Sequence, residues 1–317
     1  MTAPDAPSGT ALGPGAEFDL VRKLLARWGP VAEGVGDDAA VVAVPAGNRL
    51  VVSTDTAVEG THFRWEWLAA DEIGWRAAAG ALSDLAAMGA APLGLLCAIT
   101  LPGDGVARLD GLAAGIGALC GAAGCPIVGG DLTRGDRWSL TMTVLGAAPR
   151  PVGRSGGRPG DHVYVTGTLG GPAAALAALA RGAAPDPAWR ERLARPMPRL
   201  REGRWLAGHG VAAMIDVSDG LASELRHLAA ASRIAIDVAL EAVPRIGGVS
   251  PAAAAVSGEE YELLCLASTE LDDAAFQQRF ALPLTRIGRV GAGQAGVRFT
   301  LDGDRVDPGS GYDHFST

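Results

Sequence analysis

Six aspartates stand at the ends of expected helices and strands, in small-residue or apolar surroundings where an unpaired acid is costly. They are Asp38, Asp55, Asp84, Asp131, Asp216 and Asp219. Lys23 is the single lysine of the chain, so lysine side chains cannot neutralise all of these acids. Hard divalent cations prefer oxygen ligands, and Mg²⁺ held by carboxylates typically also holds the phosphates of a substrate. The six acids therefore favour a magnesium site that handles phosphates.

The first two of these acids are expected to face each other. The residue pattern predicts two strands, Ala39–Val44 and Arg49–Thr54, joined by a turn at Pro45–Asn48. In a hairpin of this register, Asp38 and Asp55 lie opposite each other at the open end. Like charges directly opposite on a sheet repel each other, so this pair calls for a cation.

Asp84 lies in a predicted helix, Asp71–Met88, that is apolar on every side. A helix of this kind is buried in the core of its domain. Leu82 and Ala86 belong to one apolar stripe of the helix, and Asp84 points away from that stripe. Because a buried carboxylate without a partner is costly, Asp84 also calls for a positive charge.

The composition limits the partners and the location of the protein. The 317 residues include 27 basic and 35 acidic side chains, and the net charge of -8 disfavours nucleic acid and acidic membranes as partners. No apolar run reaches the ~18 residues of a membrane span. Met1–Ala16 lacks the features of a signal peptide and is expected to be a disordered tail. Four cysteines without metal-binding spacing fit core positions in a reducing cytoplasm: Cys97, Cys120, Cys125 and Cys265.

The order of expected elements divides the chain into two domains of mixed α and β structure. Residues 17–148 alternate helices and strands, which suggests an α+β layer with helices on one face of a sheet. A stretch rich in Pro, Gly and Arg, Pro149–Gly160, is the candidate linker, and residues 149–317 form a second, α/β domain. Within the first domain, a short strand at Ile127–Val128 is expected to end in a turn over Gly129–Gly135.

Three further segments allow an ordinary structural explanation. Gly291–Gly296 matches a dinucleotide-binding pattern, but a strand follows it where a helix is required, so we interpret it as a hairpin turn. Gly167–Gly171 lies between a strand and a helix, where backbone N–H groups could hold a phosphate, although a plain turn explains it equally well. Ser218 and Asp219 could simply cap the next helix, which leaves Asp216 unexplained.

Eight short motifs occur in order from about Glu17 to Phe315, which is nearly the whole chain. They are Gly36–Val42, Ser53–Phe63, Leu82–Gly89, Gly129–Gly135, Val165–Gly170, Ile215–Ser223, Gly258–Leu263 and Gly311–Phe315. Taken together and in this order, the motifs resemble the thiamine-monophosphate kinase family.

The resemblance implies ATP-dependent phosphorylation of thiamine monophosphate to thiamine diphosphate, the last step of thiamine diphosphate biosynthesis. Direct in-line transfer with several Mg²⁺ ions would suit the acidic inventory, since phosphoryl transfer needs positioning and charge neutralisation above all. The resemblance also implies the fold of aminoimidazole ribonucleotide synthetase. In that fold an N-terminal α/β domain contributes strands to a dimer barrel and is followed by a C-terminal α/β domain. A homodimer with ATP and thiamine monophosphate as its small-molecule substrates is therefore expected.

The resemblance also assigns roles to single residues. Magnesium ligands would be Asp38, Ser53, Thr54, Asp55, Asp84, Asp131, Asp216 and Asp219, and the six aspartates among them would be the catalytic set. Contacts to ATP or its metals would come from Ser53, Thr54, Gly130, Asp131, Arg154 and Ser218. Contacts to the thiamine moiety would come from His62, Glu259 and Tyr312. On the residues alone, His62 could equally be an ordinary loop histidine, and Arg154 a solvated linker arginine.

The chain departs from the pattern of the family at three places. Leu132 replaces a usual threonine. Ser257-Gly-Glu-Glu replaces Gly-Gly-Glu-Asp, and Gly171-Pro172 replaces Asp-Ser after the glycine-rich segment. None of these departures changes one of the six aspartates, so the expected metal chemistry is retained.

Two alternative functions stay open at this point. A sister ATP-dependent enzyme of the same fold, such as aminoimidazole ribonucleotide synthetase, would share the metal chemistry. Val58–Phe63 and the ending Gly311–Phe315 favour the thiamine branch. The absence of a reactive cysteine near the N-terminus disfavours a selenophosphate synthetase-like protein. A catalytically inactive binding protein is the other alternative. The six acids argue against it, because clustered carboxylates without a function would only destabilise the fold.

Overall fold

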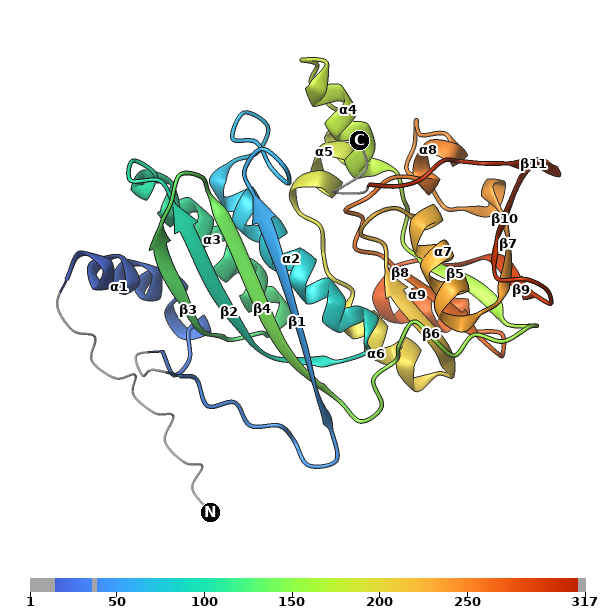
Figure 1. The fold of residues 1–317 in the computed structure, drawn as a ribbon, viewed down its shortest axis with the longest axis horizontal. Helices are drawn as coiled ribbons and strands as arrows, with labels where there is room; N and C mark the ends of the chain where they lie inside the picture. Colours follow the sequence, from blue (N-terminus) through green and yellow to red (C-terminus); the bar gives the residue numbers. More distant parts are fainter. Residues whose placement is uncertain (1–14, 36–38, 313–317) are drawn as a thin grey trace. The chain divides into compact units, whose positions relative to one another are not determined.

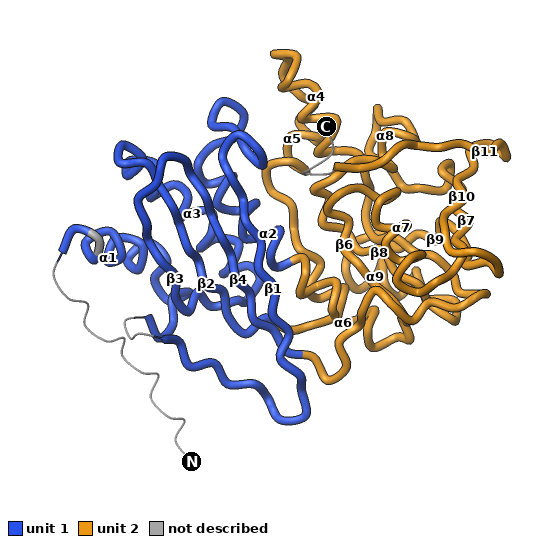
Figure 2. Tube along the Cα trace, in the orientation of Figure 1, with its two compact units in different colours: residues 1–82, 92–147 blue, residues 83–91, 148–317 orange. Residues whose placement is uncertain are grey.

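The computed structural model describes residues 15–35 and 39–312, which form two compact units (Figures 1 and 2). Unit 1 comprises Met1–Leu82 and Pro92–Ala147, and unit 2 comprises Ser83–Ala91 and Ala148–Thr317. Each unit combines helices with a sheet, so the predicted two-domain mixed α/β class is confirmed. Asp38 and most of the predicted tail lie outside the described residues, and Ala16 of that tail is the first residue of a helix.

Unit 1 is built from a four-stranded sheet and three α-helices within the described residues. The helices are α1 (Ala16–Trp28), α2 (Ala70–Ala87) and α3 (Val106–Ala123), with a short 3-10 helix η1 (Gly29–Val31) after the first. The strands are β1 (Arg49–Val58), β2 (Ala91–Leu101), β3 (Ile127–Arg134) and β4 (Ser139–Ala148). Their order in the sheet is β1-β4-β2-β3, so β1 and β3 form opposite edges.

One face of this sheet is covered by α2 and α3, as Figure 1 shows. In the central strand β4, Leu140 and Met142 are fully buried, while Thr141 and Thr143 between them are only half-buried. This alternation of period two is typical of a strand with one face in a core. The two helices approach closely through glycine, because a Cβ on Gly74 would lie 2.1 Å from the backbone oxygen of Leu112.

The predicted hairpin before β1 is wrong. Residues Ala39–Val44 have no strand structure, although the turn is present, since the Asn48 N–H donates to the Pro45 oxygen at 3.1 Å. Val41 is fully exposed, so the alternating pattern of this segment does not correspond to a buried face. The proposed opposition of Asp38 and Asp55 therefore has no hairpin to support it.

The predicted turn at Gly129–Gly135 is also wrong, because β3 continues through Arg134. β3 pairs in parallel with β2 from Leu96↔Gly129 to Leu101↔Arg134. The adjacent glycines suggested a turn, but Gly130 instead permits close strand approach. A Cβ at that position would lie 2.0 Å from the backbone oxygen of Cys97.

One helix, α3, meets the length and mean hydropathy criteria for a membrane span. It is not an uninterrupted apolar run, because it contains Arg108 and Asp110. Its residues Leu112, Ile116 and Leu119 are fully buried inside unit 1. The core helix of a soluble domain passes the same test, so this finding is weak evidence for a membrane span.

Unit 2 holds a seven-stranded sheet of order β11-β10-β7-β9-β5-β8-β6. The strands are β5 (His162–Thr166), β6 (Val211–Asp216), β7 (Ala235–Ala239), β8 (Leu263–Ala267), β9 (Leu284–Gly291), β10 (Gly296–Leu301) and β11 (Asp304–Val306). The helices are α4 (Gly171–Ala180), α5 (Pro187–Ala194), α6 (Leu200–Gly208), α7 (Leu221–Ser232), α8 (Pro251–Ala255) and α9 (Asp273–Phe280), with the 3-10 helix η2 (Leu240–Ala242). β10 and β7 are parallel, and the other described strand pairs are antiparallel.

The core of unit 2 lies between its sheet and α7. Leu221, Leu225 and Leu228 of α7 are fully buried together with apolar residues of six strands. This 3–4 residue spacing is typical of a helix with one face in a core. All four cysteines of the chain are buried free thiols, in agreement with their predicted core positions.

Candidate active site

Asp216, the last residue of β6, is a buried carboxylate that contacts the end of α2. Its exposed fraction is 4%, and its Oδ2 accepts a hydrogen bond of 2.7 Å from the Ser83 hydroxyl. Ser83 and Asp84 lie in the segment of α2 that belongs to unit 2. The fold therefore brings together two acids that are 132 positions apart, Asp84 and Asp216. Asp84 itself is half-buried, so the expectation that it would be the fully buried acid is wrong.

The electrostatics of Asp216 favour a cation beside it. Burial, and after it the negative charge of Asp84, raises the pKa of Asp216 to about 7. The Ser83 hydroxyl opposes this shift, and the charge of Glu224 adds to it. Among the described residues, no positive side chain lowers the pKa of Asp216. A buried acid without a cation beside it suits a metal-binding position.

Glu224, in the first turn of α7, is a second buried acid that the sequence analysis did not single out. Its carboxylate accepts from the backbone N–H of Asp219 at 3.0 Å and from the Ser218 hydroxyl at 3.4 Å. Burial raises the pKa of Glu224 to about 7, and the charge of Asp219 also raises it, while Arg154 lowers it. Arg154 is thus close enough to act on this acid. The N-cap of α7 is Gly220, with no side-chain cap, so Ser218 and Asp219 do not cap this helix. Glu224 instead holds the turn that contains them.

Two other motifs of the chain meet the same turn. The Glu259 N–H donates to the Ser218 oxygen at 2.6 Å, and the Tyr312 N–H donates to the Asp219 oxygen at 3.0 Å. Gly311 is required for this approach, because a Cβ there would lie 1.7 Å from the Asp219 oxygen. Ser218, Asp219, Glu259 and Tyr312 were predicted from motifs far apart in sequence, and the fold places their backbones in contact.

The predicted residues of unit 1 fall on the two edges of its sheet. Ser53, Thr54 and Asp55 are on β1, and Gly130 and Asp131 are on β3. Two strands separate these edges, and with ~4.8 Å between neighbouring strands the two acids are ~14 Å or more apart. One chain therefore does not bring Asp55 and Asp131 to the same ion.

His62 lies in the turn that follows β1 and is held by the backbone. Its ring Nδ1 accepts from the Val58 N–H at 3.0 Å, and the backbone N–H of His62 donates to the Val58 oxygen at 2.9 Å. Because Nδ1 is an acceptor, the proton of the neutral ring is on Nε2. His62 is thus a histidine whose ring is positioned by the backbone of the turn.

Several amide groups at the glycine-rich segment before α4 are bound within the protein. The Gly170 N–H donates to the Glu260 carboxylate, and the Leu169 N–H donates to the Pro244 oxygen at 2.9 Å. The Ala173 N–H donates to the Ser257 hydroxyl at 3.3 Å. The anion at this helix start is therefore a side chain of the protein, and the turn explanation of Gly167–Gly171 is the better one.

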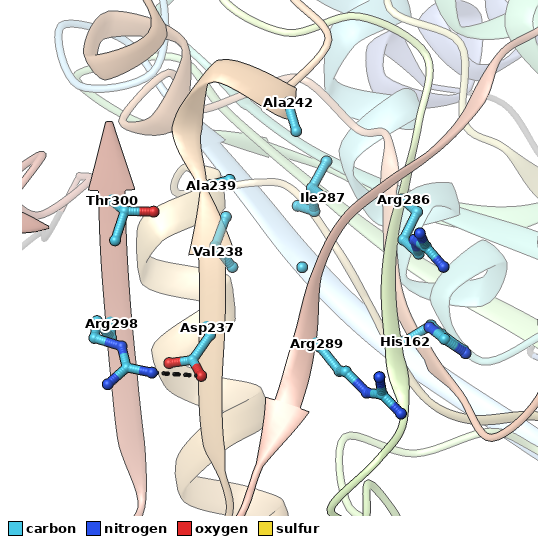
Figure 3. Close-up of a pocket in the computed structure, with 11 residues that line it drawn as sticks. His162, Asp237, Val238, Ala239, Ala242, Arg286, Ile287, Arg289, Arg298 and Thr300 are labelled. Atoms are coloured by element: carbon cyan, nitrogen blue, oxygen red, sulfur yellow. Dashed lines mark hydrogen bonds and ion pairs between the residues drawn. The ribbon is translucent and has the colours of Figure 1, made fainter. Parts of the chain in front are cut away.

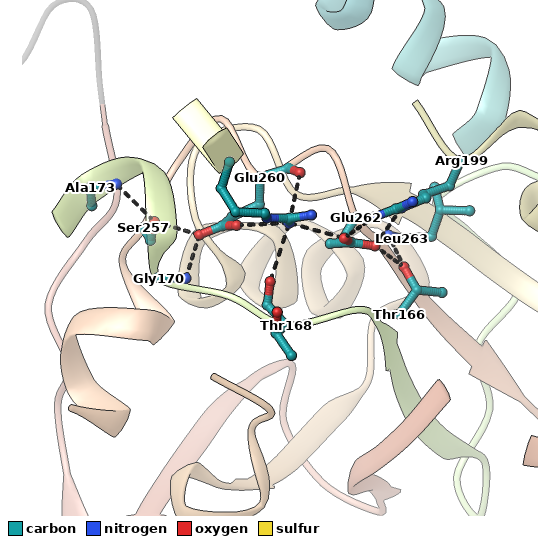
Figure 4. Close-up of polar contacts among 10 residues, drawn as sticks. Thr166, Thr168, Gly170, Ala173, Arg199, Ser257, Glu260, Glu262 and Leu263 are labelled. Atoms are coloured by element: carbon teal, nitrogen blue, oxygen red, sulfur yellow. Dashed lines mark hydrogen bonds and ion pairs between the residues drawn. The ribbon is translucent and has the colours of Figure 1, made fainter. Parts of the chain in front are cut away.

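A buried charge cluster of four side chains supports this region: Arg192, Arg199, Glu260 and Glu262 (Figure 4). Glu262 is fully buried and accepts from Arg199 Nε at 2.8 Å, from Arg192 Nη2 at 2.9 Å and from the Thr166 hydroxyl at 2.7 Å. Burial alone would raise the pKa of Glu262, but Arg199 and then Arg192 hold it below the usual range. This acid is ionised and paired, unlike Asp216.

We expect Arg199→Ala to destabilise the protein by about 3–5 kcal/mol, because it leaves a buried carboxylate with incomplete compensation. Urea unfolding followed by circular dichroism measures the change. Arg286→Ala is the matched control, since Arg286 makes an exposed ion pair of 2.9 Å with Glu270 and such pairs contribute less than about 1 kcal/mol. Equal losses in both variants would show that the buried cluster is not the stronger interaction.

A separate hollow of about 450 Å³ lies over β5, β7, β9 and β10 (Figure 3). Arginines and an acid border it, and Arg298 pairs with Asp237 at 2.7 Å. None of the predicted site residues that the structure describes lines this hollow. We therefore place the candidate active site at the acids and turns described above, and not here.

Comparisons with known proteins agree with the motifs. The family of AIR synthase related proteins matches twice, with its N-terminal domain at residues 36–148 and its C-terminal domain at residues 158–300. Thiamine-monophosphate kinase of Salmonella typhimurium is 38% identical over 324 residues, which cover 95% of this chain and 98% of that protein. This chain belongs to the thiamine-monophosphate kinase family.

Solved structures support the same family. Thiamine-monophosphate kinase from Stenotrophomonas maltophilia is 35% identical with a TM-score of 0.80, and the match covers 92% of this chain and 98% of that one. A structure of AaThiL complexed with AMPPCP and TMP is 30% identical with a TM-score of 0.75 and covers 94% and 96% of the two chains. The two domains of the thiamine-monophosphate kinase family thus extend over nearly the whole of this chain.

Proposed function

We propose that this protein transfers the terminal phosphoryl group of ATP to thiamine monophosphate and so forms thiamine diphosphate. The observation that carries the proposal is the full-length similarity to a protein whose structure holds AMPPCP and TMP. The test is ADP formation with purified protein, ATP and Mg²⁺, with and without thiamine monophosphate. ADP formation that does not depend on thiamine monophosphate would contradict the proposal.

The proposed magnesium ligands form two groups, one in each unit. Asp84, Asp216 and Asp219 belong to unit 2, and Ser53, Thr54, Asp55 and Asp131 belong to unit 1, while Asp38 lies outside the described residues. Among the described residues, no set of three or more His, Cys, Asp and Glu side chains is placed to hold a metal on its own. Phosphate oxygens and water would supply the other ligands, as is usual for Mg²⁺. Bound there, magnesium would neutralise phosphate charge and align the reacting oxygens.

The other roles follow the same division. Gly130, Arg154 and Ser218 are proposed to contact ATP, and the charge of Arg154 already acts on Glu224 beside Ser218. His62, Glu259 and Tyr312 are proposed to contact the thiamine moiety. Glu259 and Tyr312 bind the backbone of the Ser218–Asp219 turn, which fixes where the acceptor would lie relative to the acids of unit 2.

Magnesium together with a non-hydrolysable ATP analogue is expected to raise the melting temperature of the protein. Ligands that bind only the folded state stabilise it, by about 2.7 kcal/mol at a hundred times the dissociation constant. Differential scanning fluorimetry with increasing ligand measures the effect. If the melting curve with both ligands coincides with the curve in EDTA, the acids do not form a metal site.

The edges of the unit 1 sheet support a homodimer, and we propose that its two sheets form one barrel. β1 and β3 are edge strands within the described chain, and exposed edges favour pairing with another strand. Leu50 and Val52 of β1 are also about half exposed. A barrel that joins the β1 edge of one copy to the β3 edge of the other would bring the partner's Asp131 to Asp55. We also propose a cytoplasmic location, where the four free thiols stay reduced.

Light scattering is expected to give about twice the 32.1 kDa of one chain across micromolar concentrations.

Asp55→Asn and Asp131→Asn are each expected to be inactive alone. Mixed after unfolding and refolding together, they are expected to regain about a quarter of the activity, because half of the dimers are mixed and each has one intact site of two. A monomer mass, or a mixture that stays inactive, would contradict the shared site.

A further inference from the structure

The segment Ser257–Glu262, here called the acidic loop, has an unusual backbone. Glu259 has a φ of 56° and Tyr261 a φ of 52°, although neither residue is glycine. Left-handed conformations of bulky residues are costly and persist only where the surroundings impose them. The contacts that impose them are therefore of interest for the function of Glu259.

Glu260 ties the acidic loop to the glycine-rich segment Gly167–Gly171. Figure 4 shows its carboxylate between Ser257 and Gly170. The Ser257 hydroxyl donates to Glu260 Oε1 at 2.6 Å, and the Gly170 N–H donates to the same oxygen. The exposed fractions of Ser257 and Glu260 are 0% and 1%, so these contacts are made away from water.

Arg192 connects both glutamates of the loop. Its Nη2 lies 3.2 Å from Glu260 Oε2 and 2.9 Å from Glu262 Oε1, and it also donates to the Thr168 oxygen at 3.2 Å. One guanidinium thus holds the acidic loop at two of its residues, Glu260 and Glu262, against Thr168, which follows the end of β5. We call Glu260 with its partners Arg192 and Ser257 the anchor. Glu259 precedes Glu260 in the chain, and the Glu259 N–H donates to the Ser218 oxygen.

Gly171 leaves the space that Arg192 occupies. A Cβ at Gly171 would lie 2.8 Å from the Cβ of Arg192. The absence of a side chain there lets Arg192 reach both Glu260 and Glu262.

We propose that Glu260, held by Arg192 and Ser257, is a positioning residue that fixes the acidic loop so that Glu259 can bind the thiamine moiety of the acceptor. This inference rests on the proposed function for the role of Glu259 and adds the residues that set its position. It predicts a specific effect on the acceptor, because the anchor contacts the loop of Glu259 directly, whereas Ser218, which is proposed for ATP, is reached only through the Glu259 backbone.

Steady-state kinetics of Glu260→Gln test the proposal. Glutamine keeps the shape but places an amide against Arg192, so the KM for thiamine monophosphate is expected to rise about tenfold while the KM for ATP stays unchanged. Ser257→Ala removes two hydrogen bonds, one to Glu260 and one from the Ala173 N–H, leaves every charge in place and is expected to give a smaller rise of the same kind. Glu270→Gln is the control, since Glu270 makes an exposed ion pair and is expected to behave as the wild type.

A double-mutant cycle separates positioning from general damage. In a Glu259→Gln background, Glu260→Gln is expected to add little, because both changes act on the same contact. Additive losses, or equal changes in both KM values, would overturn the proposal.

Hydrogen exchange provides a readout that does not depend on turnover. Peptides that cover the acidic loop and the glycine-rich segment are expected to exchange faster in Glu260→Gln, with β7 unchanged. Unchanged exchange in the loop would overturn the positioning role. A wild-type protein without acceptor-dependent turnover would instead contradict the proposed function, so the two failures are distinguishable.

Discussion

Asp84→Asn is expected to give a folded protein whose kcat/KM for thiamine monophosphate is about 10²–10³-fold lower, the usual loss for one element of charge stabilisation. The change keeps the shape of the side chain and removes the negative charge that raises the pKa of Asp216. The measurement is the rate of ADP formation at saturating Mg²⁺ and ATP. Asp110→Asn is the matched control, because Asp110 is an exposed aspartate of α3.

The same variant is expected to be at least as stable as the wild type without metal. The raised pKa of Asp216 means that its folded form keeps a proton that the unfolded chain loses at lower pH. The associated stability is present below the usual aspartate pKa and is lost as pH rises through about 7. At pH 8, removal of the Asp84 charge relieves the repulsion on ionised Asp216, so the unfolding midpoint in EDTA should not fall. An unfolded variant would indicate a structural role, and an active one would remove Asp84 from the ligand set.

The second large effect concerns the acceptor, since free thiamine is expected to be a substrate about 10²–10⁴-fold poorer than thiamine monophosphate. That range is what a positioned general base contributes to a reaction that needs one. A hydroxyl acceptor needs a base, whereas a phosphate acceptor is ionised near neutral pH and needs cations to offset the repulsion between two polyanions. The chain offers acids for such cations and little for a base.

One side chain that could have been a base is held by the backbone. The Nδ1 of His62 accepts from the Val58 N–H, so that nitrogen cannot take a proton from an acceptor. Chromatography of the products from ATP with either acceptor measures the preference. Comparable formation of thiamine monophosphate from thiamine would refute the argument.

The sequence predicted α2, whose apolar residues repeat with a clear period. The helix lies within a residue of its predicted bounds, Asp71–Met88. The pattern failed where spacing alone is ambiguous. The alternating residues of Ala39–Val44 resemble a strand although Val41 is fully exposed, and Gly129–Gly130 resembles a turn although β3 runs through it.

For the candidate site, the sequence located the acids but not their partners. The contact of Ser83 with Asp216 joins a helix to a strand 133 residues away, and no local pattern encodes such a contact. Glu224 could have been noticed as an acid in the first turn of a helix. The buried charge cluster could not, because the pairing of Arg199 with Glu262 follows from the packing of separate elements.

Transfer of label from ATP is the most direct test of the central claim. The protein is incubated with γ-labelled ATP, Mg²⁺ and thiamine monophosphate, and the products and the protein are separated. We predict that the label appears in thiamine diphosphate in equal amount to the ADP formed, with no labelled protein at any time. Label released as inorganic phosphate, or held on the protein and then passed to product, would contradict direct transfer to thiamine monophosphate.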